Sequence, residues 1–471
     1  MNLAIEKFLY LDSAALFGVI AHKPWAMFLD SGVVNAKRPV SKYADFDVLA
    51  FNPCMTLVTE GRSTSIESNA GKVRSTNDPI QLLQEQIRGL MPEVNGDDYT
   101  NCPYLPGALG YFSYDLARRY ETLENFAVDD EQLPDMAMGI YPALLVVDHR
   151  HRVSQLIYLS DSEHARHSVA LWREIIDSYL KNQNSAAMIM NHPVEYAAKS
   201  VQDNMKYKDY QQRFQAVRDY TIAGDCYQVN LAKRFSVDTD EDAWQIYQTL
   251  RESSPAPYAA YLNFPFAIVL SNSPESFIQC RNHLVTTSPI KGTAARDHTD
   301  SGNDKKIAAQ LANSPKDRAE NLMIVDLMRN DLGRCCELGS IKVPSLFKLH
   351  SFANVHHLIS TITGVLKPDL HALDLLRSCF PGGSITGAPK VRAMQIIEEL
   401  EPHRRGLYCG CIAYIGCDGS LETNIAIRTV VIKEGVARFS AGGGLVIDSK
   451  LAEEYQEIVD KAKMLKQALC G

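Results

Sequence analysis

Apolar positions recur at helical spacing in residues 315–333, which predicts an amphipathic helix. Ser314 is suited to cap its first turn, and Pro315 fits the first helical position because that position needs no backbone N–H. Gly333 favours the end of the helix. The buried side of this helix is expected to consist of Met323, Ile324, Leu327 and Met328.

A second amphipathic helix is predicted near the C-terminus, in residues 449–465. Its apolar residues recur three or four positions apart, so they would bury one side of the helix against the rest of the chain. These residues are Leu451, Tyr455, Ile458, Ala462 and Leu465.

Each of these two helices carries a pair of carboxylates three positions apart, and therefore on one face. The first pair is Asp317 and Glu320, and the second is Glu454 and Glu457. If both pairs face a common cleft, their oxygens form a site for a hard cation such as Mg²⁺, with water and substrate oxygens completing the coordination. The alternative is a solvated acidic first turn on each helix, stabilised by the helix dipole.

Short apolar runs predict strands in both halves of the chain. In the first half they include residues 46–51 and 139–148. In the second half, four runs follow one another at short spacing, which predicts an antiparallel meander because no helix fits between them. These runs are residues 258–262, 267–271, 276–280 and 285–287.

The chain is expected to divide into two regions. Residues 1–190 form the first region, and residues 203–467 form the second, which begins with a predicted helix at 207–222. The stretch 181–193 is polar, rich in asparagine and ends in proline, which is typical of a connection between two such regions.

The composition is that of a globular protein with enough apolar residues for a large core. The 471 residues are 46% apolar and 22% charged, with a formal net charge of −8. No run of lysine and arginine marks a nucleic-acid or membrane surface, so neither is expected as a partner. Charges interrupt the apolar N-terminus, which argues against a signal peptide or membrane span and predicts a cytoplasmic location. The eleven cysteines lack the spacing of a zinc site, which predicts reduced thiols.

Five motifs in a fixed order resemble those of the chorismate-utilising enzymes. They are S-P-E at 273–275, P-I-K-G-T at 289–293, K-D-R-A-E-N-L-M-I-V-D-L-M-R-N-D at 316–331, G-A-P-K at 387–390 and A-G-G-G at 441–444. The match is nearly continuous over the second region and looser over the first. The resemblance implies an α+β fold, in which stacked, mostly antiparallel sheets from both regions lie at the centre and helices cover the outside.

The resemblance also assigns individual residues to a site. It implies that Glu275 is a general acid for a leaving hydroxyl and that Lys291 is a nucleophile. The resemblance implies that Glu320 and Glu457 bind Mg²⁺ and that Asp317 and Glu454 support them. Contacts to chorismate are implied for Gly292, Thr293, His357, Ser384, Tyr408, Arg428, Gly442 and Gly444.

Lys291 separates the activities within this family. Anthranilate synthases carry a small residue at this place, whereas the enzymes that form 4-amino-4-deoxychorismate, isochorismate or salicylate carry lysine. The similarity is strongest to the first of these, which implies conversion of chorismate and ammonia to 4-amino-4-deoxychorismate, a step toward 4-aminobenzoate and folate. The alternatives are isochorismate, salicylate or anthranilate synthesis, and an inactive sensor of chorismate or an aromatic amino acid. The sequence is compatible with two actions of Lys291: covalent attack on the substrate, and positioning of the substrate by charge alone.

The source of ammonia is expected to be a second protein. No G-x-C-x-G nucleophile motif for glutamine hydrolysis occurs in the sequence. The resemblance likewise implies a separate glutamine amidotransferase subunit as the partner.

A tryptophan site is a further expectation from the resemblance. Anthranilate synthases bind feedback tryptophan with a serine in an early motif and a later S-P-x-x-Y-like segment, and residues 28–32 and 254–258 are loose counterparts. Ser31, Pro257 and Tyr258 would then lie near the amino acid. The alternative is that these are ordinary turn residues.

Overall fold

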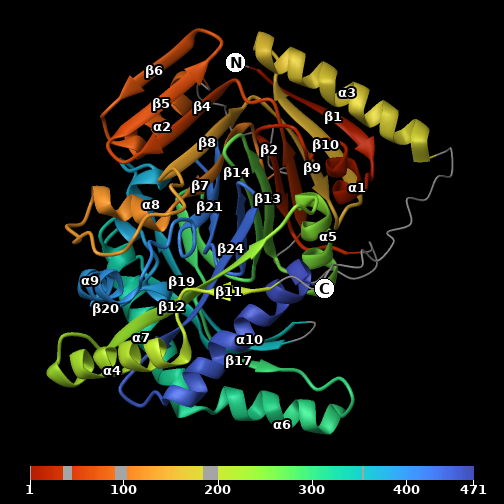
Figure 1. The fold of residues 1–471 in the computed structure, drawn as a ribbon. Helices are drawn as coiled ribbons and strands as arrows, with labels where there is room; N and C mark the ends of the chain where they lie inside the picture. The colour runs from red at the N-terminus through yellow and green to blue at the C-terminus, as the bar shows by residue number, and fades with distance from the viewer. Residues whose placement is uncertain (1, 35–44, 91–102, 184–199, 353–354, 471) are drawn as a thin grey trace.

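Two large antiparallel sheets stacked face to face form the centre of the molecule, and the helices lie outside them (Figure 1). The computed structural model describes residues 2–34, 45–90, 103–183, 200–352 and 355–470. Apolar side chains between the sheets, such as Val48 and Leu144 from one and Leu109 and Ile412 from the other, form a shared core. The expected α+β architecture is confirmed.

The first sheet has the strand order β1-β10-β9-β3-β2-β13-β14-β23-β24-β12-β11, with β20 paired to β12. Its strands are β1 (Leu3–Leu9), β2 (Ala26–Asp30), β3 (Phe46–Ala50), β9 (Ala143–Asp148), β10 (Val153–Leu159), β11 (Gln202–Asp203), β12 (Gln228–Asp238), β13 (Tyr258–Phe264), β14 (Ala267–Ser273), β20 (Gly387–Ala388), β23 (Thr429–Lys433) and β24 (Val436–Leu445).

The second sheet has the order β17-β19-β16-β15-β22-β21-β7-β8-β4-β5-β6, with β18 paired to β19. Its strands are β4 (Met55–Glu60), β5 (Ser63–Ser68), β6 (Gly71–Ser75), β7 (Gly107–Phe112), β8 (Met136–Tyr141), β15 (Ser276–Arg281), β16 (Leu284–Thr287), β17 (Ile290–Ala295), β18 (Lys342–Ser351), β19 (Val355–Val365), β21 (Cys411–Gly416) and β22 (Leu421–Asn424).

Helices bury the outer faces of both sheets. One core packs the first sheet against helices that include α3, α4, α5 and α10, and another packs the second sheet against helices that include α2, α7 and α8. The helices are α1 (Ser13–Gly18), α2 (Pro79–Leu90), α3 (Glu163–Gln183), α4 (Tyr207–Ala223), α5 (Ala243–Ser253), α6 (Ser301–Ala312), α7 (Pro315–Gly333), α8 (Ala372–Cys379), α9 (Lys390–Leu400) and α10 (Leu451–Cys470), with short 3-10 turns η2 (Tyr114–Arg119) and η3 (Gly383–Ile385).

Each sheet contains strands from both sequence regions. In the first sheet, β2 of the first region pairs with β13 of the second, and in the second sheet β7 pairs with β21. The two regions therefore share both sheets and the core between them. The expected connection at 181–193 falls largely outside the described residues.

Two strand predictions are wrong in the same way. The run 139–148 is two strands, because Pro142 lies between β8 of the second sheet and β9 of the first. The predicted meander at 258–287 is two hairpins in different sheets, since β13 pairs with β14, β15 pairs with β16, and Pro274 lies between the hairpins. Proline lacks a donor for the ladder, so it marks the place where the chain leaves a sheet.

The helix predictions at 207–222, 315–333 and 449–465 are confirmed as α4, α7 and α10. Ser314 caps α7, accepting a hydrogen bond from the N–H of Asp317, and Pro315 occupies its first turn. Of the apolar face predicted for α7, Ile324 and Met328 are fully buried.

The described cysteines are all free, and most are buried. Among the helices of the described ranges, none is long and apolar enough to cross a membrane.

Glycines 107 and 110 lie inside β7, where a Cβ would clash with the carbonyl oxygens of Ile415 and Ala137 on the neighbouring strands. Glycine at both positions therefore allows β7 to pack closely against its neighbouring strands.

Candidate active site

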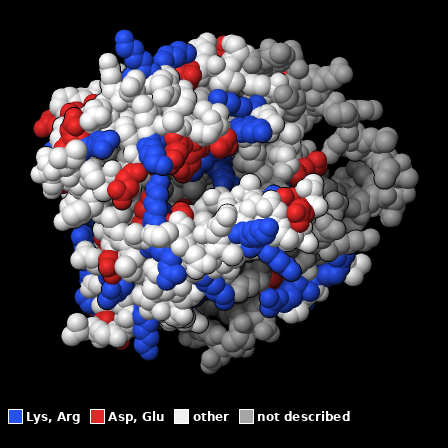
Figure 2. All heavy atoms as spheres, turned by 90° about the horizontal axis from the view of Figure 1, so that it is seen from below, with Lys and Arg blue, Asp and Glu red and all other residues white. Residues whose placement is uncertain are grey.

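A cavity of about 1100 Å³ lies between α7, α10, β17, β24 and the turn η3. On the face that carries α4 and α6, acidic and basic side chains gather around a hollow (Figure 2). Every residue that the sequence assigned to catalysis, chorismate contact or metal binding lines this cavity. The fold thus brings together side chains from segments as far apart as residues 275 and 457.

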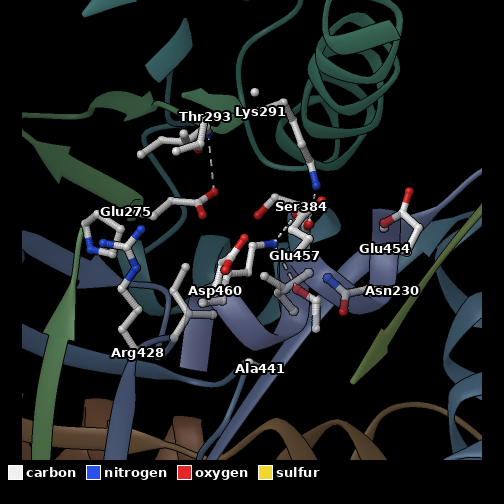
Figure 3. A pocket seen from close by; sticks show the side chains of 18 of the residues that line it. Asn230, Glu275, Lys291, Thr293, Ser384, Arg428, Ala441, Glu454, Glu457 and Asp460 are labelled. Carbon is white, nitrogen blue, oxygen red and sulfur yellow. Dashed lines mark hydrogen bonds and ion pairs between the residues drawn. The ribbon is translucent and has the colours of Figure 1, made fainter. Parts of the chain in front are cut away.

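Lys291 enters the cavity from a bulge in β17. The pairing of β17 with β19 shifts register here, and Gly292 has a φ of +82°, which glycine adopts without strain. The Nζ of Lys291 donates a hydrogen bond of 2.9 Å to the carbonyl oxygen of Ser384 (Figure 3). A Cβ at residue 292 would lie 3.0 Å from Oδ1 of Asp317, so this glycine also lets β17 approach α7.

Glu275 lies where the chain passes from β14 to β15, and its side chain is buried. The N–H of Ile290 lies 3.5 Å from its Oε1, and Ser384 contributes a side-chain hydrogen bond. Burial raises the pKa of Glu275 above its usual value, although the charge of Lys291 opposes the shift. The raised pKa favours the protonated form that a general acid needs.

Burial has the opposite effect on Lys291. It lowers the pKa of the Lys291 ammonium, while the carboxylates of Glu320 and Glu275 oppose the shift. A lysine is a nucleophile only as the neutral amine, so the lowered pKa increases the reactive fraction at a given pH.

Arg428 lies near Glu275 in the cavity, and His357 lies near Arg428. Arg428 has a φ of +50°, and Figure 3 shows its guanidinium directed toward Glu275. His357 on β19 shares a hydrogen bond of 2.9 Å between its Nδ1 and the Oγ1 of Thr293. Burial and the charge of Arg428 lower the pKa of His357 to about 3, so its imidazole is neutral near pH 7. This group suits recognition of a carboxylate by a planar cation and neutral hydrogen-bonding partners.

The four carboxylates of α7 and α10 form the opposite wall of the cavity. Glu454 accepts a hydrogen bond from Ser449 at 2.7 Å and lies 3.2 Å from the Nζ of Lys316. Glu457 pairs with Lys461 at 2.6 Å. Lysines of the same two helices thus offset part of the negative charge.

The comparison with protein families matches chorismate binding enzymes over residues 37–467. This chain belongs to that family. The match includes both sequence regions, in agreement with the strands that they share.

Curated members of the chorismate binding family are similar over nearly the whole chain. "Aminodeoxychorismate synthase component 1" of Escherichia coli K12 is 45% identical, with 98% of each sequence covered. "Anthranilate synthase component 1" of Acetivibrio thermocellus is 34% identical, covering 91% of this chain and 87% of that protein. The crystal structure of anthranilate synthase component I from Streptococcus pneumoniae superposes with a TM-score of 0.78 at 30% identity, covering 92% of this chain and 94% of that one.

The donor set of this family member fits a hard divalent cation. Carboxylate oxygens from α7 and α10 face one cavity, and such oxygens are the ligands that Mg²⁺ prefers. Among the described residues, no three acidic, histidine or cysteine side chains are already arranged as a metal cluster. A Cβ at Gly443 would lie 3.2 Å from Glu454 and 3.7 Å from Glu457, so glycine here allows α10 to pack closely on β24.

The cavity residues that were not predicted from the sequence include Lys316, Lys461 and Asn230. Lys316 and Lys461 contact the acidic wall, and Lys461 also donates to the carbonyl oxygen of Gly442 at 2.9 Å. Asn230 on β12 has a buried Oδ1 without a hydrogen-bond partner and lines the same cavity. Lys316 directly precedes Asp317, and Lys461 follows Glu457 by four positions, so their spacing from the predicted carboxylates could have identified both lysines. No sequence pattern marks Asn230 as a cavity residue.

The remaining predicted contacts are mainly backbone and packing positions. Gly442 and Gly444 lie on β24 against β12, where a Cβ would come within 2.6 Å of the Leu231 carbonyl oxygen and 2.3 Å of the Gln228 side chain. Close strand packing is thus one reason for glycine at both places. Tyr408 is buried with its ring 5.7 Å from the guanidinium of Arg405.

The residues of the expected tryptophan site meet in a second, separate cavity. Ser31, Pro257 and Tyr258 line a space of about 70 Å³ beside the pairing of β2 with β13. The Ser31 hydroxyl donates to Asp47 at 2.6 Å. Asp47 is buried, yet its hydrogen bond and charge interaction with His149 hold its pKa at about 2, so it stays an acceptor for Ser31.

Proposed function

We propose that this chain converts chorismate and ammonia to 4-amino-4-deoxychorismate, as the component I enzyme of a two-protein system. The observation that carries the proposal is the pairing of Lys291, whose pKa is lowered, with Glu275, whose pKa is raised, in one cavity. The extensive similarity to a relative named aminodeoxychorismate synthase component 1 supports it. The lower identity to an anthranilate synthase favours it over anthranilate formation.

Chorismate is a dianion, so binding needs two anion-accepting places. Arg428 would take one carboxylate with its planar guanidinium, next to the neutral pair of His357 and Thr293. The ring carboxylate would face α7 and α10. Mg²⁺, held by Glu320 and Glu457, would supply a Lewis acid that binds this carboxylate and polarises the conjugated ring.

The chemical steps follow from the neighbours of Lys291. Its neutral amine would attack C2, the ring double bond would shift, and the C4–O bond would break as Glu275 gives its proton to the departing hydroxyl, which leaves as water. Ammonia would then attack C4, the double bond would shift back, and the C2–N bond would break with its electron pair returning to the Lys291 nitrogen. The new ammonium at C4 would give one proton to the Glu275 carboxylate, which restores the acid. The net change is replacement of the C4 hydroxyl by an amino group.

A product assay tests this function. Purified protein with chorismate, Mg²⁺ and ammonium at alkaline pH should give a product with the mass of 4-amino-4-deoxychorismate. Anthranilate, isochorismate or salicylate would replace the proposal with one of the other activities of the family. Binding of chorismate without any turnover would identify an inactive sensor.

The nitrogen source provides a second test. We propose that a glutamine amidotransferase subunit delivers ammonia to this chain. Glutamine alone should give negligible product, and glutamine with that subunit should approach the rate seen with ammonium. Equal rates with and without the subunit would remove it as partner.

The pH dependence should be bell-shaped, because the two shifted groups act in opposite protonation states. Lys291 must be neutral, so activity should fall as pH drops through its lowered pKa. Glu275 must be protonated, so activity should also fall as pH rises through its raised pKa. Glu275→Gln should lower kcat by about 10²–10⁴-fold and remove the alkaline limb, measured as kcat/KM against pH. An unchanged alkaline limb in this variant would assign that limb to another group.

We also propose that tryptophan is held near Ser31, Pro257 and Tyr258. The three residues line one cavity, which supports their joint action on a ligand, but its space of about 70 Å³ must widen to hold an indole ring. Protein purified without dialysis should release tryptophan on denaturation, detected by mass, and Ser31→Ala should release less. Absence of tryptophan from native protein, together with no binding in equilibrium dialysis, would leave these residues with structural roles alone.

A further inference from the structure

Lys316 provides a cationic bridge between the two acidic helices. It follows Pro315 in the first turn of α7, and its Nζ lies 3.2 Å from Oε1 of Glu454 on α10. The same Nζ lies 4.0 Å from Oε1 of Glu320. A lysine ammonium is positively charged near pH 7, so Lys316 places a cation between these two carboxylates.

We infer that Lys316 is an internal counter-ion that competes with the divalent metal for the carboxylates of α7 and α10. A metal between the helices would meet the Lys316 ammonium at distances where like charges repel, so the ammonium must move away before the metal binds well. The ring carboxylate of bound chorismate then compensates for the positive charge of the metal. This inference rests on the metal site of the proposed function and makes tight metal binding dependent on bound substrate.

The surroundings of Lys316 allow such a movement. Its side chain is 44% exposed, and an unbranched lysine can swing toward solvent at little cost. Glu454 keeps its hydrogen bond from Ser449 when Lys316 departs. Lys461, in contrast, has two closer partners, with its Nζ 2.6 Å from Glu457 and 2.9 Å from the carbonyl oxygen of Gly442.

Calorimetric titration with Mg²⁺ in the absence of chorismate tests the inference on the full chain. Lys316→Gln should bind Mg²⁺ about tenfold more tightly than the unchanged protein, because one competing charge is removed. Lys316→Arg keeps the charge and should bind as weakly as the unchanged protein. Lys450→Gln is the matched control, since Lys450 pairs with the exposed Glu453 on α10, and it should change the dissociation constant less than twofold.

Thermal unfolding gives a readout that is independent of titration heats. With EDTA, Lys316→Gln should have a lower Tm than the unchanged protein, because Glu320 and Glu454 then repel each other, and Mg²⁺ should raise its Tm by more. Equal Mg²⁺ affinity in Lys316→Gln and the unchanged protein, or an equal shift in Lys450→Gln, would overturn the inference. If no variant binds Mg²⁺ at millimolar concentration without chorismate, the inference fails, while equilibrium dialysis with chorismate still tests the metal site and the product assay still decides the reaction.

Discussion

Lys291→Ala should lower the rate of 4-amino-4-deoxychorismate formation by about 10³-fold or more, because it removes the proposed nucleophile of the first step. The unchanged protein, given chorismate and Mg²⁺ without ammonia, should accumulate a covalent adduct on Lys291. Intact mass after rapid quenching, followed by peptide mapping, measures this adduct. Lys291→Ala should show no adduct under the same conditions.

Two variants separate a covalent lysine from a positioning charge. Lys291→Arg keeps the positive charge, yet it should not restore activity, since a guanidinium stays protonated and cannot attack C2. Lys305→Ala on α6 removes an exposed lysine and should leave rate and adduct unchanged. Brisk turnover without any adduct, together with a largely active Lys291→Ala, would show that Lys291 only positions the substrate.

Glu320→Gln and Glu457→Gln should each lower kcat by about 10³-fold while leaving the Tm within a few degrees of the unchanged protein. Each change removes a charged side chain at the cavity wall, the proposed metal ligand, and spares the apolar core of the helix. EDTA should abolish the activity of the unchanged protein, and Mg²⁺ should restore it. Mg²⁺ binding in the presence of chorismate, measured by equilibrium dialysis, should weaken in parallel with kcat.

Asp326→Asn is the control for the Glu320→Gln and Glu457→Gln variants. Asp326 lies on the exposed side of α7 and pairs with Arg329, so its charge is removed at a distance from the cavity. It should retain full activity and Mg²⁺ binding. A near-normal rate of Glu320→Gln or Glu457→Gln at limiting Mg²⁺ would exclude that residue as a direct ligand.

The sequence alone was sufficient for the local features of the site. The limits of α7 follow from Ser314, Pro315 and Gly333, since capping and helix propensity act within a few residues. The i, i+3 spacing of Asp317 with Glu320 fixes both carboxylates on one face, whatever lies opposite. The residues assigned through the ordered motifs all line one cavity, and one motif contains a local backbone feature, the bulge at Gly292, that glycine favours.

Only the tertiary structure decided which segments meet. Strand propensity described β14 and β15 well, yet it could not tell that Pro274 sends them into different sheets and so buries Glu275 between them. The contact of Lys316 with Glu454, over more than a hundred residues, likewise depends on how α7 and α10 pack on the sheets. Such contacts arise from burial of apolar faces across the whole core, and the opposite pKa shifts of Lys291 and Glu275 follow from that burial, which no local pattern contains.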